Sequence, residues 1–319
     1  MKKPNVLVTR QVASEAIALL QEVAEVDVWT QDEPIPRQRL LEKAENADGI
    51  LAMLTERIDE ELLARAKRLQ IVANMAVGYD NIDLPACKAR GIHVTNTPDV
   101  LTEATADLAF ALLMATGRRL IEANRFLMNG EWTAWSPSLM AGKNVYGATL
   151  GIIGMGRIGE AVARRAKGFG MKILYHNRSQ KPQAEAETGA VRVSLEALLR
   201  ESDFVVLLTP LTEETRLLMG DQQFSWMKPT SVFINVSRGG TVDEAALHWA
   251  LSSGKIWAAG LDVFQQEPVP VDHPLLALPN VVALPHIGSA TEQTRAEMAK
   301  LAAANIAAVL AGKGPLTAL

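Results

Sequence analysis

The 319-residue chain contains a single cysteine, Cys87, and this scarcity excludes an intrachain disulfide framework. One thiol suits a reducing compartment, so we expect a cytoplasmic protein. No uninterrupted apolar stretch approaches the roughly 18 residues that a membrane span requires, and we expect no membrane partner. The N-terminal segment MKKPNVLVTR holds only a short apolar run, which predicts a first strand and not a signal peptide.

The sequence also lacks a basic excess and any metal-binding pattern. Its formal net charge is −4 and its pI is about 5.8, so we expect no nucleic-acid partner. The histidines show no metal-ligand spacing and form no cluster with Cys87, which argues against a metal site. The remaining composition, 48% hydrophobic and 21% charged, is that of a globular protein long enough for two domains.

Short apolar runs alternate with helical patterns along the chain, which is typical of βα units and a parallel sheet. Two such series are present, and they predict an α/β protein of two doubly wound, Rossmann-like domains. The first series of strands is Val6–Val8, Val26–Val28, Gly49–Met53, Ile71–Ala73 and His93–Thr95. The second is Thr149–Ile153, Lys172–Tyr175, Phe204–Leu208, Ser231–Val236, Ala258–Asp262 and Val281–Leu284.

Two helical segments suggest how these domains are connected. Val100–Gly130 has few helix breakers and predicts one long helix between the two series. Thr291–Leu310 is alanine-rich and no strand follows it, so we expect it to cross back over the first series. The substrate domain is then discontinuous, comprising residues 1–98 and 287–319, and it flanks a dinucleotide-binding domain of residues 99–286. A linear division of the chain into two domains is the alternative.

A glycine fingerprint opens the second series, in the stretch TLGIIGMGRIGEAVARR. Gly154-x-Gly156-x-x-Gly159 follows an apolar strand and precedes a helix, so its glycines supply a tight turn, room for a pyrophosphate and close helix–strand contact. The helix N-terminus directs backbone N–H groups at the phosphates. Such a motif alone is weak evidence, but the strand before it and the strand after its helix make dinucleotide binding the favoured interpretation.

The carboxylate that normally follows this fingerprint is missing. An NAD site usually carries Asp or Glu about 20 residues on, to bind the ribose 2′-hydroxyl. No acid lies between Ala161 and Ala184, and the second strand ends instead in Asn177, Arg178 and Ser179. Arginine suits a 2′-phosphate, so this edge predicts a preference for NADPH, with NADH also possible.

Three ionisable residues follow later strands of the second series, where ligands of α/β sheets bind. They are Arg238 in NVSRGG, Glu267 in QQEP and His286 in PHIGS. Hydride transfer to a small 2-oxo acid builds charge on the carbonyl oxygen, and a positioned acid must protonate it. We therefore interpret His286 as the general acid, Glu267 as the group that orients it, and Arg238 as the clamp on the substrate.

Taken together, the segments VGYDN, GMGRIG, NVSRGG, GLDVF, QEP and PHIGS resemble the D-isomer-specific 2-hydroxyacid dehydrogenase family over essentially the whole chain. The resemblance implies a homodimer formed through the nucleotide domains and an Arg–Glu–His catalytic set. It also implies that backbone N–H groups of Val77 and Gly78 hold the substrate carboxylate. The cofactor contacts that it implies are Thr105, Gly154, Met155, Gly156, Arg157, Ile158, Asn177, Arg178, Ser179, Thr209, Pro210, Thr215, Val236, Ser237, Asp262 and Gly288.

Within this family the chain is most similar to the glyoxylate/hydroxypyruvate reductase branch. GEWTAWSP resembles that branch's WxxW element, which implies that Trp135 narrows the substrate pocket of the partner subunit while Trp132 packs. Burial of both tryptophans at a dimer interface is the alternative. Leu54, at the end of a strand in the first series, is a further candidate for the substrate side of the cleft.

Other functions remain compatible with these residues. A phosphoglycerate, D-lactate or phosphite dehydrogenase would share most of the motifs, although we expect no added regulatory domain here. A nucleotide-sensing protein similar to the C-terminal-binding-protein corepressors is an alternative from another class. Turnover of NADPH with glyoxylate would separate the reductase from the sensor.

Overall fold

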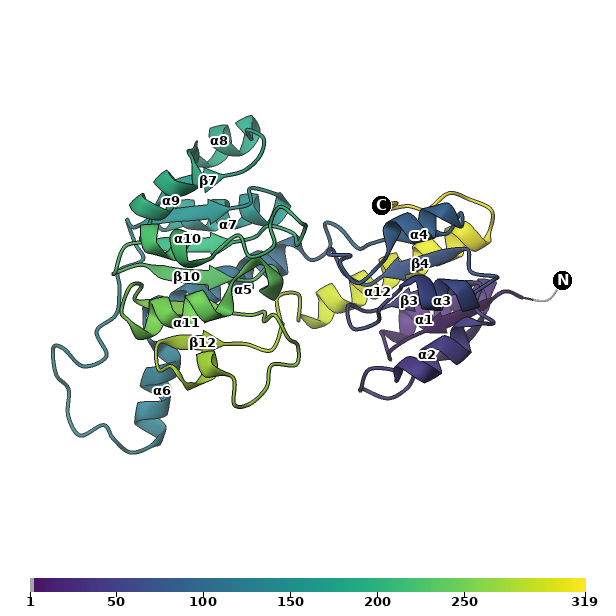
Figure 1. Cartoon of the computed structure of the whole chain (residues 1–319), viewed down its shortest axis with the longest axis horizontal. Coiled ribbons are helices and arrows are strands. Elements are labelled where there is room, and N and C mark those ends of the chain that lie inside the picture. The colour runs from purple at the N-terminus through teal and green to yellow at the C-terminus, as the bar shows by residue number, and fades with distance from the viewer. Residues whose placement is uncertain (1–2) are drawn as a thin grey trace. The chain divides into compact units, whose positions relative to one another are not determined.

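The chain forms two compact α/β units, in agreement with the predicted fold class (Figure 1). A computed structural model describes residues 3–319. The first unit runs to Leu101 and resumes at Ser289, and the second is Thr102–Gly288. Within the described residues, no helix is long and apolar enough to cross a membrane.

The first unit is built on a five-stranded, fully parallel sheet in the order β2-β1-β3-β4-β5. Its strands are β1 (Asn5–Val8), β2 (Glu25–Val28), β3 (Gly49–Ala52), β4 (Ile71–Asn74) and β5 (His93–Thr95). Its helices are α1 (Ser14–Val23), α2 (Arg37–Ala44), α3 (Glu60–Arg65), α4 (Leu84–Ala89) and α12 (Glu292–Leu310). Strand order reverses between β1 and β3, so the loops after these strands open at the position where α/β sheets bind ligands.

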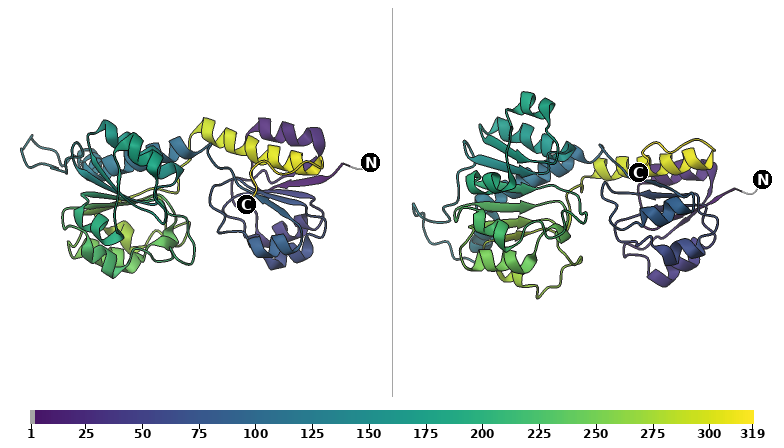
Figure 2. Two further views of the ribbon diagram at one scale, coloured as in Figure 1. Left: turned by 90° about the horizontal axis from the view of Figure 1, so that it is seen from above. Right: turned by 45° about the horizontal axis from the view of Figure 1, so that its top comes forward.

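Helix α12 belongs to the first sheet although it lies at the other end of the sequence. It packs beside α1 and against β3 and β4, and Figure 2 shows the two helices side by side. Because helices cover both faces of the central strands, these strands are continuous apolar runs. Ile50, Leu51 and Val72 are fully buried there. The expected return of the last helix to the first series of strands is therefore observed.

The second unit is built on a seven-stranded parallel sheet in the order β12-β11-β10-β9-β6-β7-β8. Its strands are β6 (Thr149–Ile153), β7 (Lys172–His176), β8 (Val191–Arg192), β9 (Phe204–Leu207), β10 (Val232–Asn235), β11 (Ala258–Leu261) and β12 (Val281–Ala283). This is the dinucleotide-binding arrangement, with its reversal of strand order between β6 and β9. The carboxyl end of β6 is where the glycine fingerprint begins.

Helices cover both faces of this second sheet. The helices of this unit are α5 (Thr102–Gly117), α6 (Leu120–Met128), α7 (Arg157–Gly168), α8 (Pro182–Thr188), α9 (Leu195–Glu201), α10 (Asp221–Trp226) and α11 (Glu244–Ser252), with short 3-10 turns η1 (Gly239–Thr241) and η2 (Pro274–Ala277). Helix α6 follows α5, projects from the unit and does not cover the sheet (Figure 1). Two apolar cores result. One includes Leu150, Val162 and Ile234, and the other includes Leu207, Phe233 and Leu247.

Two details differ from the sequence prediction. The single helix predicted over Val100–Gly130 is two helices, because Arg119 adopts a left-handed backbone (φ 54°) between α5 and α6 and pairs with Glu122. Strand β8 was not predicted, since two residues are too few to show an alternating pattern. The eleven predicted strands are all present, with ends displaced by no more than one residue.

Candidate active site

The glycine fingerprint forms a tight turn between β6 and α7, and each glycine has a separate physical reason. Gly154 has φ +100°, a conformation that favours glycine. A Cβ on Gly159 would lie 2.4 Å from the carbonyl oxygen of Gly154, so only glycine lets the helix approach the turn. A Cβ on Gly156 would meet nothing within 4 Å. The open space at Gly156, at the N-terminus of α7, fits the phosphates of a dinucleotide.

The end of β7 lies directly beside this turn. The N–H of Gly154 donates to the carbonyl oxygen of His176 at 2.9 Å, which brings the following Asn177, Arg178 and Ser179 to the fingerprint. The side chains of Arg178 and Ser179 are exposed, while Asn177 is half-buried and donates to the carbonyl oxygen of Ser179. The segment Asn177–Ser179 therefore presents an arginine and a hydroxyl, and itself contains no carboxylate, next to the glycine fingerprint.

Three neighbouring strands, β10, β11 and β12, bring the candidate catalytic residues to one edge of the sheet. Nδ1 of His286 lies 2.6 Å from Oε2 of Glu267. An ionised carboxylate can only accept a hydrogen bond, so the proton of this pair is on Nδ1 and the other ring nitrogen, Nε2, faces away from Glu267. Both side chains remain about one-third exposed, at 29% and 35%, so reactants can reach them.

Glu267 is held as a carboxylate. Burial by itself raises the pKa of the Glu267 carboxyl. The pKa nevertheless lies below its usual value, because three groups stabilise the carboxylate: the hydrogen-bonded, positively charged form of His286, the N–H of Phe264 and the positive charge of Arg238. Phe264 donates to Oε1 at 3.0 Å while His286 occupies Oε2. The two oxygens thus have separate partners, which fixes the carboxylate plane and with it the imidazole ring.

Arg238 is placed beside Glu267 by an unusually close backbone approach. A Cβ on Gly239 would lie 1.8 Å from the carbonyl carbon of Phe264, so η1 can press on the segment after β11 only because this residue is glycine. The carbonyl oxygen of Arg238 accepts from Asn235 Nδ2 (3.1 Å) and Thr241 Oγ1 (2.6 Å). The backbone of the arginine is therefore anchored at both sides of its own turn.

Asp262, at the end of β11, organises the backbone of the histidine loop. Its carbonyl oxygen accepts from the N–H of His286 (2.9 Å), and its Oδ1 accepts from the N–H of Ile287 (2.8 Å). These bonds hold His286 in a left-handed conformation (φ 54°), which costs free energy in a residue other than glycine. Burial raises the pKa of the Asp262 carboxyl above its ordinary value.

The other predicted cofactor contacts lie around these two regions. A Cβ on Gly288 would sit 3.3 Å from Asp262 and 3.5 Å from Thr105, so these three residues form one group. Met155 and Thr209 flank Gly154, and the Thr209 hydroxyl is buried without a hydrogen-bond partner among the described residues. The hydroxyl of Thr215 instead closes its own loop by donating to Pro210 (2.6 Å). Arg157 and Ile158 open α7, and Val236 and Ser237 follow β10.

In the first unit, the predicted substrate contacts occur in the loops after β3 and β4. Leu54 follows β3 and is half-buried, whereas Val77 and Gly78 follow β4. Asn96 Nδ2 donates to the carbonyl oxygen of Val77 at 2.9 Å, and Asn74 Nδ2 donates to that of Gly78 at 2.8 Å. Across the described chain, neither N–H of Val77 or Gly78 donates to a protein acceptor, so both remain available to an anion.

Comparison with known proteins adds an independent observation. Residues 110–288 match the NAD-binding domain of D-isomer specific 2-hydroxyacid dehydrogenases. A glyoxylate reductase from Thermococcus gammatolerans is 53% identical over 319 residues, covering 99% of this chain and 95% of the relative.

The chain belongs to the D-isomer specific 2-hydroxyacid dehydrogenase family. It is therefore an enzyme of the 2-hydroxyacid dehydrogenase class, and the predicted family is confirmed.

Solved structures support the same assignment. The TT0316 protein from Thermus thermophilus has the same fold as this chain, with a TM-score of 0.93 and 46% identity over 99% of each chain. An NADPH-dependent glyoxylate/hydroxypyruvate reductase from Sinorhizobium meliloti, solved with NADP and malonate, gives a TM-score of 0.86 at 36% identity. That similarity covers 100% of this chain and 97% of the Sinorhizobium protein.

The structure adds a residue of the dehydrogenase that sequence reasoning missed. Arg192, on β8, donates from Nε to the carbonyl oxygen of Asn177 (3.2 Å) and from Nη2 to that of Arg178 (2.8 Å). It thus fixes the backbone beside the cofactor turn. No local signal identifies Arg192, because the contact joins residues 14 and 15 positions apart through an unpredicted strand.

Proposed function

We propose that this dehydrogenase reduces glyoxylate to glycolate and hydroxypyruvate to D-glycerate, with NADPH as the preferred reductant and NADH as a possible substitute. The observation that carries the proposal is the 2.6 Å contact between His286 and Glu267 in the unit that holds the dinucleotide fingerprint. Relatives named glyoxylate reductase support the substrate, and the Sinorhizobium structure supports both hydroxypyruvate and NADPH.

His286 is the proton donor in this proposal. Reduction of a carbonyl leaves negative charge on its oxygen, and a proton from Nε2 of a protonated His286 neutralises it. Glu267 stabilises the protonated ring and holds Nδ1, so the donor nitrogen has one orientation. When bound, NADPH supplies the hydride, which is chemistry that protein side chains do not provide.

Binding of the 2-oxo acid is shared between side-chain and backbone groups. Arg238 supplies a planar guanidinium that can hold a carboxylate or polarise the carbonyl oxygen. The N–H groups of Val77 and Gly78 provide two further donors for the carboxylate, and their carbonyl oxygens are already bound by asparagine side chains. We assign substrate binding to residues 1–98 and 287–319, and dinucleotide binding to residues 99–286.

The NADPH preference is attributed to the edge after β7. Arg178 and Ser179 are exposed there and can bind a 2′-phosphate, while Arg192 holds the loop backbone. The absence of a carboxylate between Ala161 and Ala184 removes the repulsion that such a phosphate would otherwise meet. Charge-assisted hydrogen bonds of this kind are among the stronger polar contacts in proteins.

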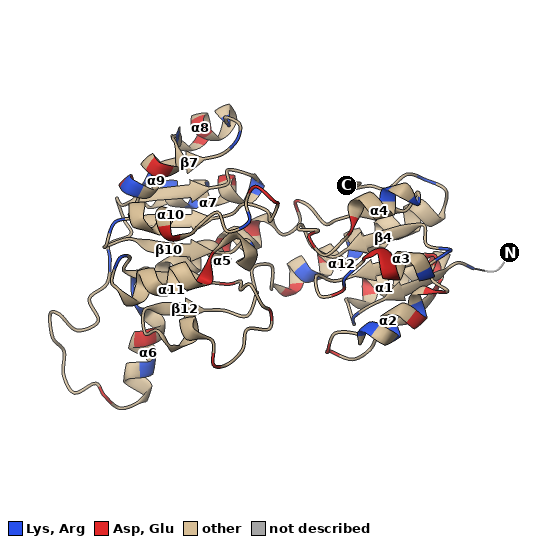
Figure 3. Cartoon of the chain, in the orientation of Figure 1, with Lys and Arg blue, Asp and Glu red and all other residues tan. Residues whose placement is uncertain are grey.

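An exposed apolar arm supports a homodimer. Helix α6 buries none of its residues, and a long loop follows it (Figure 1). The chain rejoins the core of the second unit at Val145. Figure 3 shows few charged positions along this arm. Its exposed apolar side chains are Leu120, Ile121, Leu127, Met128, Trp132, Trp135 and Leu139. Apolar surface of this extent indicates a protein partner, and we propose a second copy, with Trp135 reaching the partner's substrate site.

The test is a substrate panel read by the absorbance of the reduced nicotinamide. Glyoxylate and hydroxypyruvate should consume NADPH faster than pyruvate or a phosphorylated 2-oxo acid does, and NADP with phosphite should give no product. A cytoplasmic location goes with this proposal, because NADPH and 2-oxo acids are available there. Cofactor binding without turnover of any 2-oxo acid would favour the sensor alternative and contradict the reductase.

A further inference from the structure

The loops after β3 and β4 are joined by one side chain, Asn81. Its Nδ2 donates to the carbonyl oxygens of Met53 (3.1 Å) and Glu56 (2.9 Å), which bracket Leu54 in the first loop. Asn81 itself belongs to the second loop, three residues after Gly78. The N–H of Ile58 donates in turn to the carbonyl oxygen of Asn81 (2.9 Å), so the two loops are bonded in both directions.

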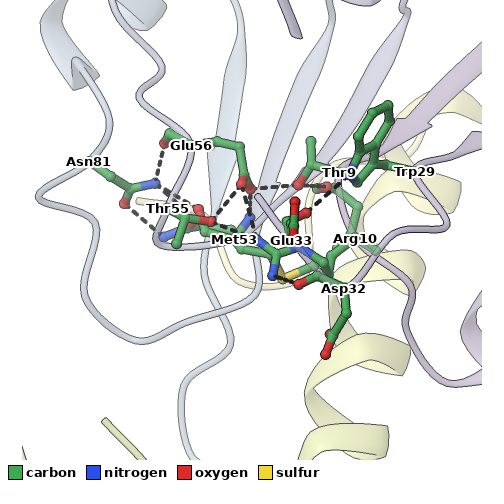
Figure 4. A network of polar contacts seen from close by, with 11 residues as sticks. Thr9, Arg10, Trp29, Asp32, Glu33, Met53, Thr55, Glu56 and Asn81 are labelled. Atoms are coloured by element: carbon green, nitrogen blue, oxygen red, sulfur yellow. Dashed lines mark hydrogen bonds and ion pairs between the residues drawn. The ribbon is translucent and has the colours of Figure 1, made fainter. Parts of the chain in front are cut away.

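The first loop is also held by the buried carboxylate of Glu56, which binds groups other than Asn81 (Figure 4). Glu56 is 2% exposed, and its Oε2 accepts from Thr9 Oγ1 (2.5 Å) and the N–H of Met53 (2.6 Å). Its Oε1 accepts from Thr55 Oγ1 (2.6 Å), and Arg10 Nη2 lies 3.8 Å away. These contacts tie the loop to the end of β1. Asn81 is thus the link from this anchored loop to the loop that contains Val77 and Gly78.

Asn74, the last residue of β4, completes the link to the second loop. Its Nδ2 donates to Asn81 Oδ1 (3.2 Å), and Asn81 Nδ2 lies 3.3 Å from Asn74 Oδ1, so the two amides face each other. Asn74 is fully buried and also holds the carbonyl oxygen of Gly78. A displacement of the Asn81 amide would therefore reach Leu54 on one side and the Gly78 peptide on the other.

We propose that Asn81 is a positioning residue for substrate recognition, which sets the spacing between Leu54 and the Val77–Gly78 donors. This inference rests on the proposed function, since those residues are its predicted substrate contacts. The spacing determines how large a 2-oxo acid fits while its carboxylate remains bound to the two N–H groups. Asn81 belongs to the first unit, whereas the glycine fingerprint and His286 belong to the second, so we expect its effect to be confined to recognition of the 2-oxo acid.

The test compares Asn81→Ala and Asn81→Asp with Asn5→Ala, each introduced into the whole 319-residue chain and purified in the same way. Asn5 lies in the same unit, at the opposite end of β1, and its amide also donates to one backbone carbonyl oxygen, that of Asn46. Loss of a backbone-directed hydrogen bond from Asn81 should raise KM for glyoxylate about tenfold. The value of kcat and the KM for NADPH should stay within about twofold, and the preference for glyoxylate over pyruvate should fall.

Asn81→Asp retains the oxygen that faces Asn74 but loses the amide donor, so it should resemble Asn81→Ala in substrate preference. A Leu54→Ala background provides the second measurement, because removal of Leu54 should abolish most of the effect of Asn81→Ala on that preference.

Two results would overturn the inference while leaving the reductase intact. One is a fall in kcat and a rise in both KM values together, and the other is the same substrate preference in the Asn81 and Asn5 variants. A wild-type enzyme inert towards every 2-oxo acid would instead defeat the proposed function first, and the inference with it.

Discussion

The two units share a parallel-sheet architecture but use the carboxyl ends of their strands in opposite ways. In the second unit, the strand ends of β10–β12 present ionisable side chains, Arg238, Glu267 and His286. In the first unit, the carboxylate at the equivalent edge, Glu56, is buried in hydrogen bonds, and the loops offer backbone N–H groups. The same sheet edge can thus carry chemistry through charged side chains or recognition through a held backbone.

The contrast follows from what each task requires. In the proposed function His286 is a proton donor that must gain and lose charge, and the side chains of His286 and Glu267 are about one-third exposed to solvent. The proposed anion site consists of backbone N–H groups whose dipoles must be held in place, and Asn74, Asn81 and Asn96 donate to carbonyl oxygens of the same loops. Asparagine suits this role because one side chain donates and accepts without titrating.

The largest expected effect is on kcat, and it comes from the ionisable side chains that follow β10–β12. His286→Gln should lower kcat about 10³-fold, because glutamine cannot deliver a proton, while the Kd for NADPH changes less than about twofold. Stopped-flow turnover and fluorescence titration of NADPH measure the two quantities. His273→Gln is the matched control, since His273 also pairs with a glutamate, Glu244, at 3.2 Å in the same unit. Equal losses of turnover and NADPH affinity would contradict the role of His286.

The second largest expected effect is on the KM for NADPH, and it comes from the segment after β7. Arg178→Ala should raise KM for NADPH about tenfold and change that for NADH little, because only NADPH carries the 2′-phosphate. Arg200→Ala provides the control, as Arg200 is an exposed arginine of the same unit paired with Glu196 on α9. If both cofactors respond alike to Arg178→Ala, the attribution of NADPH preference to this edge is wrong.

A substitution in the apolar arm should have a smaller effect on the KM for the 2-oxo acid, and this effect requires that two copies of the chain associate. Trp135→Ala should raise KM for the 2-oxo acid about threefold while the protein retains twice the 34.5 kDa mass of one chain in light scattering. Trp132→Ala should leave KM unchanged, because that residue is interpreted as packing only. A wild-type monomer would contradict the arm as a dimer contact.

The smallest expected effect is on stability. Since the pKa of Glu267 is lowered in the folded state, its carboxylate contributes stability that is present above the unfolded value of about 4.3 and is lost as pH falls through the lowered value. Glu267→Gln should therefore melt a few degrees below wild type near neutral pH, with the difference shrinking from about pH 5 downward. A difference in Tm that widens on acidification would contradict this sign.

The sequence predicted the parallel sheets and the strand ends, since buried strands are contiguous apolar runs that can be read locally. It did not predict the break at Arg119, where a left-handed residue and a local ion pair interrupt a pattern without proline. It also did not predict Arg192 or Asn81 as structural links. Their bonds join a side chain to backbone carbonyls of another loop, and such contacts leave no periodic signal in the sequence.

The division of labour between the two units is tested most directly by measuring kcat and KM for glyoxylate on His286→Gln and Asn81→Ala side by side. We expect His286→Gln to lower kcat at nearly constant KM, whereas Asn81→Ala should raise KM at nearly constant kcat. A change in the same parameter, kcat or KM, in both variants would contradict this division. Catalysis would then not be separable from substrate recognition by the loops that Asn81 joins.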